Sequence, residues 1–101
     1  MFQNNITDNL VCRCSFEYIL VLDFEANCVE GNTINPQEII EFPVVPISVL
    51  RKEVLLDRLF HSYVDTEYTK LTPFCTQLTG ITQKHIKGKP KLAEIIVKLD
   101  Q

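Results

Sequence analysis

The chain reads Tyr18-Ile19-Leu20-Val21-Leu22-Asp23-Phe24-Glu25, an apolar run that ends in two acids. The apolar part predicts a buried β-strand. Because successive side chains of a strand point to opposite faces, Asp23 and Glu25 share one face and Phe24 takes the other. Two neighbouring carboxylates repel each other, and a hard cation that prefers oxygen ligands relieves this cost. The pattern therefore predicts a metal site at the strand end, and the alternative is a solvated turn.

Length and composition indicate one globular domain, because 101 residues that are 46% hydrophobic and 23% charged can form a modest core. The net charge of -3 gives no overall basic signal for nucleic acid. A nuclease that holds its substrate through metal ions and local lysines does not need one, so a nucleic-acid enzyme is not excluded. No apolar run approaches the length of a membrane span, and we expect no membrane partner.

The cysteines lack the paired spacing and the histidine partners of a zinc site; they are Cys12, Cys14, Cys28 and Cys75. The residues before Cys12 contain no basic region followed by an apolar one, so no secretory signal is indicated. We therefore expect reduced thiols in a cytoplasmic or nuclear protein. Residues 1–16 lack sustained periodicity and are expected to be a flexible leader before a folded part that spans 17–101.

Two further strands are predicted after the acidic corner. Residues 37–50 are rich in β-branched side chains, but Pro43 and Pro46 argue against an uninterrupted central strand, so we expect a bulge or an edge position there. A charged step at 51–53 permits a hairpin into a third strand over 56–64.

Helices are predicted for the remainder. Thr72 as N-cap, Pro73 at the first position and Gly80 just past the end delimit a short helix. A second short turn is expected over 84–86. Beyond Pro90, apolar residues at helical spacing predict an amphipathic helix that runs into the last residue. Because this apolar stripe stops after about three turns, the sequence predicts a longer parent protein.

Three separated segments carry a family resemblance: residues 18–28, residues 38–45, and Phe74-Cys75 with Leu78-Thr79-Gly80-Ile81-Thr82. In this order they resemble the first half of the DEDDh 3′–5′ exonucleases, most closely the subgroup that trims histone mRNA, ribosomal RNA and small interfering RNA. The resemblance spans roughly residues 16–101. It implies an α/β, RNase H-like exonuclease fold, present as an apparently truncated N-terminal portion: a three-stranded antiparallel meander followed by helices.

The resemblance also implies site residues. The family acids that match Asp23 and Glu25 bind two divalent metal ions, Mg²⁺ or Mn²⁺, and the Glu contacts the terminal nucleotide as well. The implied nucleotide-binding residues are Phe24, Glu25, Ala26, Leu78, Thr79 and Ile81. For Leu78 and Ile81 the alternative interpretation is core packing at a helix end.

The chain departs from the family pattern after these motifs. The family uses a second Asp from a later helix, then a His followed five residues on by a third Asp, and this His is the general base. Here His61 is followed at that spacing by Thr66 and His85 by Pro90, so neither begins the motif. We expect both histidines to be exposed, and Asp100 lies too near the end to be the second Asp.

We expect structural or solvent-exposed positions for the other charged residues. Glu38 and Glu41 lie on opposite faces of a regular strand, so without a bulge they cannot both join the acidic pair, and we expect ion pairs or solvent exposure. The lysines 84, 87, 89 and 91 are expected on a solvated face, with phosphate contact as the alternative.

Two functions remain open. The resemblance implies a metal-dependent 3′–5′ exoribonuclease domain that hydrolyses single-stranded or stem-loop RNA 3′ ends to nucleoside 5′-monophosphates, and this chain is expected to be catalytically incomplete. The alternative is a short isoform or pseudo-enzyme that acts as an RNA- or protein-binding module, with a protein partner or the missing C-terminal half.

Overall fold

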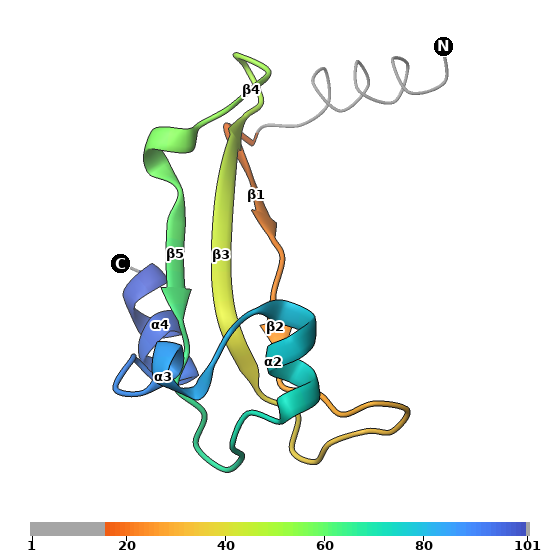
Figure 1. Ribbon diagram of the computed structural model, residues 1–101. Coiled ribbons are helices and arrows are strands. Elements are labelled where there is room, and N and C mark those ends of the chain that lie inside the picture. The colour runs from red at the N-terminus through yellow and green to blue at the C-terminus, as the bar shows by residue number, and fades with distance from the viewer. Residues whose placement is uncertain (1–15, 101) are drawn as a thin grey trace. The chain divides into compact units, whose positions relative to one another are not determined.

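The computed structural model describes residues 16–100, which form a mixed α/β fold (Figure 1). The predicted leader over 1–16 lies outside the described residues except for Phe16. The elements are β1 (Tyr18–Leu22), β2 (Glu25–Ala26), β3 (Ile39–Ser48), β4 (Glu53–Val54), a 3₁₀ turn (Leu56–Arg58), β5 (Phe60–Tyr63), α2 (Pro73–Thr79), α3 (Gln83–Ile86) and α4 (Leu92–Leu99). The described residues divide into two compact units, one of 16–21 with 44–59 and one of 22–43 with 60–100.

Strand β3 is the centre of the sheet, since β1, β2, β4 and β5 all pair with it. Strand β2 is antiparallel to β3, with Glu25 opposite Glu41 and Ala26 opposite Ile39, and the register shifts between these two pairs. Strand β4 is antiparallel to the other end of β3. The predicted meander is therefore present, with its first and third strands each broken into two short strands.

The prediction that the prolines would interrupt the second strand or place it at an edge is wrong. Pro43 and Pro46 lie inside an unbroken, central β3. Continuing the register of Glu25 with Glu41 brings Pro43 opposite Asp23, in the gap between β1 and β2. Pro46 contributes its carbonyl, which accepts a 2.9 Å bond from Leu55, just past β4. Both prolines thus lie where a neighbouring strand is interrupted, so their missing N–H groups disturb the ladder little.

The third predicted strand is shorter than expected. Residues 56–58 form a 3₁₀ turn, because Arg58 N–H donates to Leu55 O at 3.0 Å and Leu59 N–H donates to Leu56 O at 3.3 Å. Extended structure resumes only in β5. The hairpin predicted at 51–53 is present, with Lys52 at a φ of 54° in the turn.

The helix boundaries follow the local signals. The Thr72 side chain accepts the Cys75 N–H at the start of α2, and Gly80 ends the helix in the left-handed conformation with a φ of 79°. Thr82 is the N-cap of α3. Helix α4 ends at Leu99, so the prediction that it runs into the last residue is wrong.

The core of the unit that contains α2 and α3 gathers four buried side chains: Ile40, Cys75, Ile81 and Ile86. Cys28, Tyr63 and Leu71 pack against this cluster from its border. The end of β2, the end of β5 and the two short helices are therefore held by one set of apolar contacts.

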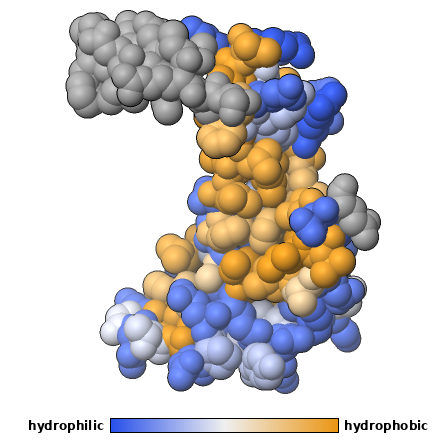
Figure 2. Space-filling view, turned by 180° about the vertical axis from the view of Figure 1, so that it is seen from behind, coloured by the Kyte–Doolittle hydropathy of each residue, from blue (hydrophilic) through white to orange (hydrophobic). Residues whose placement is uncertain are grey.

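Strand β1 is not the buried strand that its sequence predicts. Its side chains are between 44% and 58% exposed, although a strand that is apolar at every position is typical of burial on both faces. Hydrophobic residues adjoin one another over a large part of the surface seen from behind (Figure 2). None of the helices within residues 16–100 is long and apolar enough to cross a membrane.

Candidate active site

The predicted acids lie at the break in the first arm of the sheet. Asp23 and Phe24 occupy the gap between β1 and β2, and Glu25 is the first residue of β2. Asp23 is exposed and Glu25 is half-buried. The Phe24 ring lies 4.7 Å from the Phe42 ring, whereas Glu25 is opposite Glu41. Since positions 41 and 42 of β3 point to opposite faces, Glu25 and Phe24 also lie on opposite faces, as the alternation predicts.

Glu41 brings another carboxylate to the strand that pairs with β2. It lies directly across from Glu25, and its Oε2 is 2.7 Å from Nε2 of His61 on β5. The expectation of an ion-pair partner is met for Glu41. When protonated, the His61 imidazole would offset the repulsion between the two opposed glutamates.

The two histidines are exposed, as expected, and both contact Tyr63. The His61 ring meets the Tyr63 ring edge-on at 5.1 Å, and the His85 ring stacks on the same tyrosine at 5.4 Å with an interplanar angle of 14°. His85 Nδ1 also accepts the Thr82 N–H at 2.9 Å, which closes the first turn of α3. His85 is therefore used in capping.

Asn27 connects β2 to the segment before α2, and sequence reasoning missed it. Its side chain is 0% exposed. Its amide donates to Thr69 Oγ1 at 3.0 Å and to the Lys70 carbonyl at 2.9 Å, and its Oδ1 accepts the Thr72 N–H at 3.3 Å. An Asn after a strand is common in turns, so the sequence contained no signal that would single it out.

Glu38 is a structural acid. Its carboxylate accepts backbone N–H groups of Glu67, Tyr68 and Thr69 at 2.7, 3.1 and 2.9 Å, and the Thr69 hydroxyl at 2.7 Å. Burial raises the pKa of Glu38, but these hydrogen bonds stabilise the ionised form more, so the pKa lies below its usual value. Glu38 thereby orders the loop at 67–69, which Asn27 also contacts.

Of the predicted nucleotide-binding residues near the end of α2, one side chain is exposed and another is buried. Leu78 is 67% exposed, whereas Ile81 is 4% exposed and packs in the core. Between them, the Thr79 hydroxyl donates to Cys75 O at 2.8 Å and accepts the Ile81 N–H at 3.1 Å. The Leu78 side chain is therefore available to a ligand, and the Ile81 side chain is not.

Helix α2 also contacts the strand that carries the acids. The Cys75 thiol donates to the Ala26 carbonyl at 3.6 Å. Together with the Asn27 bonds, this contact fixes the start of α2 against the residues that follow Glu25. The structure thus brings Glu25, Ala26 and α2 together within one unit.

The donor chemistry of Asp23 and Glu25 fits a hard divalent cation. Both offer carboxylate oxygens, and Mg²⁺ is commonly held by one or two carboxylates together with waters and substrate phosphates. Within residues 16–100 no group of three or more His, Cys, Asp or Glu side chains forms a metal cluster.

Of the four clustered lysines, Lys91 is engaged within the protein. Its Nζ donates to Thr66 O at 2.8 Å and lies 3.5 Å from Asp65. Lys84, Lys87 and Lys89 are exposed, so a phosphate contact remains a prediction for these three.

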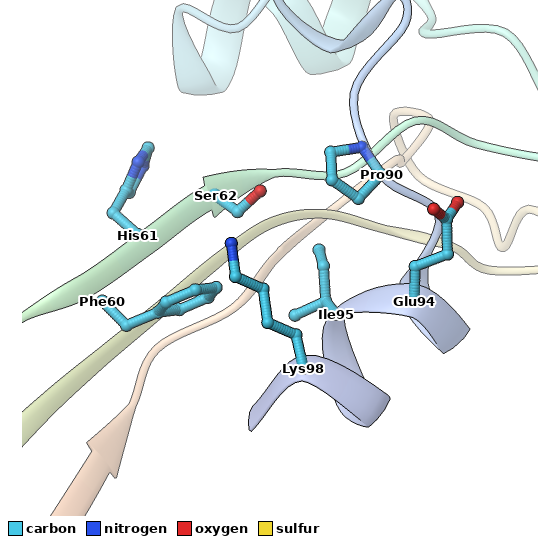
Figure 3. A pocket seen from close by; sticks show the side chains of 7 residues that line it. All are labelled: Phe60, His61, Ser62, Pro90, Glu94, Ile95 and Lys98. Carbon is cyan, nitrogen blue, oxygen red and sulfur yellow. The ribbon is translucent and has the colours of Figure 1, made fainter. Parts of the chain in front are cut away.

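A separate pocket of about 240 Å³ lies between β5 and α4 (Figure 3). Its lining comprises Phe60, His61, Ser62, Pro90, Glu94, Ile95 and Lys98. Figure 3 shows His61 pointing away from α4, as the alternation along β5 requires. The imidazole that contacts Glu41 thus lies at the rim of this pocket.

Comparison with known proteins identifies relatives. Residues 20–101 match the exonuclease family RNase_T. ERI1 exoribonuclease 3 of Homo sapiens is 44% identical over 87 residues, which are 85% of this chain and 25% of that protein. The chain therefore spans about a quarter of the length of this relative.

Solved structures share the fold. The nuclease domain of 3'hExo, a DEDDh family member bound to rAMP, has a TM-score of 0.75 and 38% identity, covering 86% of this chain and 44% of that one. A 3'-exonuclease that recognises the histone mRNA stem-loop has a TM-score of 0.74 and 40% identity, covering 83% of this chain and 37% of that one. The antiparallel sheet and the helices thus match part of an RNase H-like exonuclease fold, as the sequence predicts.

Proposed function

The chain belongs to the exonuclease family, and we propose that it supplies the first metal-binding motif of a 3′–5′ exoribonuclease. Such an enzyme shortens RNA from its 3′ end and releases nucleoside 5′-monophosphates. The observation that carries the proposal is the placement of Asp23 and Glu25 at the break between β1 and β2, next to the segment that Asn27 ties to α2.

The exonuclease family depends on divalent metal ions, and we propose Mg²⁺ or Mn²⁺ for this chain, with Asp23 and Glu25 as ligands. When bound, a pair of such ions activates a water and stabilises the leaving oxygen of a phosphodiester. Asp23 and Glu25 hold negative charge where the ions are needed. Glu41 lies beside them but is occupied by His61.

The 3′-terminal nucleotide is proposed to lie between the acids and the end of α2. Leu78 offers an exposed apolar surface for the terminal base. Phe24 is proposed to line the same site through its backbone, because its ring lies on the face opposite Glu25. Ala26 and Thr79 are proposed to line the site as well, whereas Ile81 acts by packing beneath it. RNA 3′ ends, single-stranded or in a stem-loop, are therefore the proposed ligands.

The general base of the family has no counterpart among the 101 residues, because neither His61 nor His85 is followed five residues later by Asp. The contacts of the two histidines support the view that neither is the general base, since His61 pairs with Glu41 and His85 caps α3. We propose that hydrolysis requires a base and further acids from outside these residues. Because Cys28 and Cys75 are free thiols, the cytoplasm or the nucleus is the proposed location.

A binding module is the second candidate. Exposed Leu78 and the exposed lysines 84, 87 and 89 support RNA binding without hydrolysis. In that case the acidic pair would retain metal binding, and a protein partner would complete or regulate the assembly.

Two measurements on the purified chain test the proposal: Mn²⁺ binding by water-proton relaxation, and trimming of a 3′-labelled single-stranded RNA with Mg²⁺ or Mn²⁺. The variants are Asp23→Ala with Glu25→Ala, and the matched control is Glu30→Ala, an exposed acid of the following loop. We expect Mn²⁺ binding by the wild type and the control that the double variant lacks, without trimming. Metal-dependent trimming that the double variant loses would overturn the assignment of incompleteness. Equal Mn²⁺ binding by all three proteins would overturn the metal motif.

A further inference from the structure

Two cysteines lie on segments that are joined by hydrogen bonds. Cys28 follows Asn27 after β2, and Cys75 lies in α2. The Thr72 hydroxyl donates to the Cys28 carbonyl and accepts the Cys75 N–H at 3.0 Å. One threonine side chain therefore bridges the two cysteine backbones.

The side chains of these cysteines are also neighbours. Cys28 packs against the apolar cluster that contains Cys75. The Cys75 thiol is directed toward the carbonyl of Ala26, two residues before Cys28. Both cysteines are free thiols, and they differ in access, because Cys28 is half-buried and Cys75 is 0% exposed.

We propose that Cys28 and Cys75 form a site of reversible oxidation, in which a low-molecular-weight disulfide such as oxidised glutathione converts the thiol pair to an intramolecular disulfide. This chemistry is additional to the proposed nuclease function and does not depend on it. In a reducing compartment such a bond is a transient, regulatory modification rather than a permanent cross-link.

The exchange balances in two steps. The Cys28 thiolate attacks one sulfur of the reagent, the reagent's S–S bond breaks, and one small thiolate leaves. The Cys75 thiolate then attacks the Cys28 sulfur of the mixed disulfide and displaces the second small thiolate. The two protons lost by the protein thiols go to the two small thiolates, so the protein pair is oxidised by two electrons and the reagent is reduced to two thiols.

The order of the steps follows from access. Half-buried Cys28 meets the reagent first, and fully buried Cys75 resolves the mixed disulfide from within the core. Burial, followed by the neighbouring Cys75 thiol and by Glu25, raises the pKa of Cys28, so the attacking thiolate is a smaller fraction of Cys28 than of an ordinary thiol. The bond would fasten the loop after Glu25 to α2.

The test uses a Cys12→Ser, Cys14→Ser background, which removes the two thiols outside the described residues. The folded protein is incubated with oxidised glutathione, and its intact mass and peptide map are measured. We expect loss of two hydrogen atoms, a peptide joined through Cys28 and Cys75, and a thermal midpoint raised by roughly 5 °C that a reductant reverses.

Single variants in the same background keep the test decisive. Cys75→Ala should accumulate one glutathione adduct on Cys28, and Cys28→Ser should take up little, because Cys75 is buried. Persistence of a stable mixed disulfide on Cys28 in the background protein, or two unmodified thiols after prolonged incubation, would overturn the proposal. A Cys28–Cys75 bond that forms only in denaturant would overturn it as well.

Discussion

Glu25 lies directly opposite Glu41 in the antiparallel pair of β2 and β3, and His61 contacts the second of these acids at 2.7 Å. The candidate metal ligand therefore has a fixed negative neighbour across the sheet. Cross-strand like charges destabilise a sheet unless a cation lies nearby. A protonated His61 would offset the charge of Glu41 in this way, and a metal ion would do so for Glu25.

The substitution Glu41→Gln should weaken Mn²⁺ binding. It removes a negative charge opposite Glu25 while preserving size, and the Coulomb energy lost for a doubly charged ion at this spacing corresponds to roughly a threefold to tenfold lower affinity. Water-proton relaxation measures the affinity. Glu67→Gln, in an exposed loop residue, is the control and should change little. An unchanged affinity in Glu41→Gln would show that the ion lies away from β2.

Leu78 and Ile81 should respond oppositely to truncation. Ile81→Ala should lower the free energy of unfolding by about 2–4 kcal/mol, because its side chain packs in the core, and Leu78→Ala by less than about 0.5 kcal/mol. Urea titration measures both. Leu78→Ala should instead weaken binding of an RNA 3′ end several-fold.

A large loss of stability in Leu78→Ala would contradict its assignment as a ligand contact. The variant Ile81→Val provides the graded control, with an expected cost of about 0.5–1.5 kcal/mol. If Ile81→Val reduced RNA binding without changing stability, the role of this residue beneath the site would have to be revised.

Glu38 should make stability depend on pH. Its pKa in the folded state lies below the ordinary value of 4.5, so its contribution is complete above that pH and is lost as pH falls through the folded pKa. Glu38→Gln should reduce the free energy of unfolding by about 1–3 kcal/mol near neutral pH, and this difference should shrink in acid. Urea titrations at several pH values measure it.

The exposed acid Glu30 provides the comparison for Glu38. Glu30→Gln should leave the pH profile of stability unchanged, since no backbone N–H groups of the 67–69 loop converge on it. A difference between wild type and Glu38→Gln that stays constant down to strongly acidic pH would mean that the carboxylate charge does not stabilise the loop.

Local signals made α2 predictable. Thr72, Pro73 and Gly80 each encode a helix end through their own side chain or backbone, so their spacing sufficed to give the boundaries. Strand alternation likewise predicted that Phe24 and Glu25 lie on opposite faces, as they do, whereas the metal-binding role of Asp23 and Glu25 stays a prediction. These features depend on residues close together in the chain.

Features that depend on pairing could not be read in advance. Pro43 and Pro46 fit a central strand only because the neighbouring strands are interrupted beside them. The contact of Glu41 with His61 requires the register of β3 with both neighbours. A single sequence gives the alternation within each strand but not the partner across it.

Asn27→Ala should both destabilise the protein and loosen the candidate site. It leaves the Lys70 carbonyl and the Thr72 N–H without their buried partner, which should cost about 2–4 kcal/mol in urea titration. Because Asn27 holds the start of α2 to the end of β2, the variant should also weaken RNA binding under conditions where it remains folded. Gln77→Ala changes an exposed amide of α2 and should do neither.

The two readouts for Asn27→Ala separate a positioning role from simple stability. Ile95→Val removes one methylene from the buried side of α4, outside the cluster that contains Cys75, and loses stability without touching the bonds from β2 to α2. If the two variants, compared in their folded states, weakened RNA binding equally, Asn27 would act only through stability. A larger loss of binding in Asn27→Ala would establish that its hydrogen bonds set the position of α2, and with it Leu78, relative to Glu25.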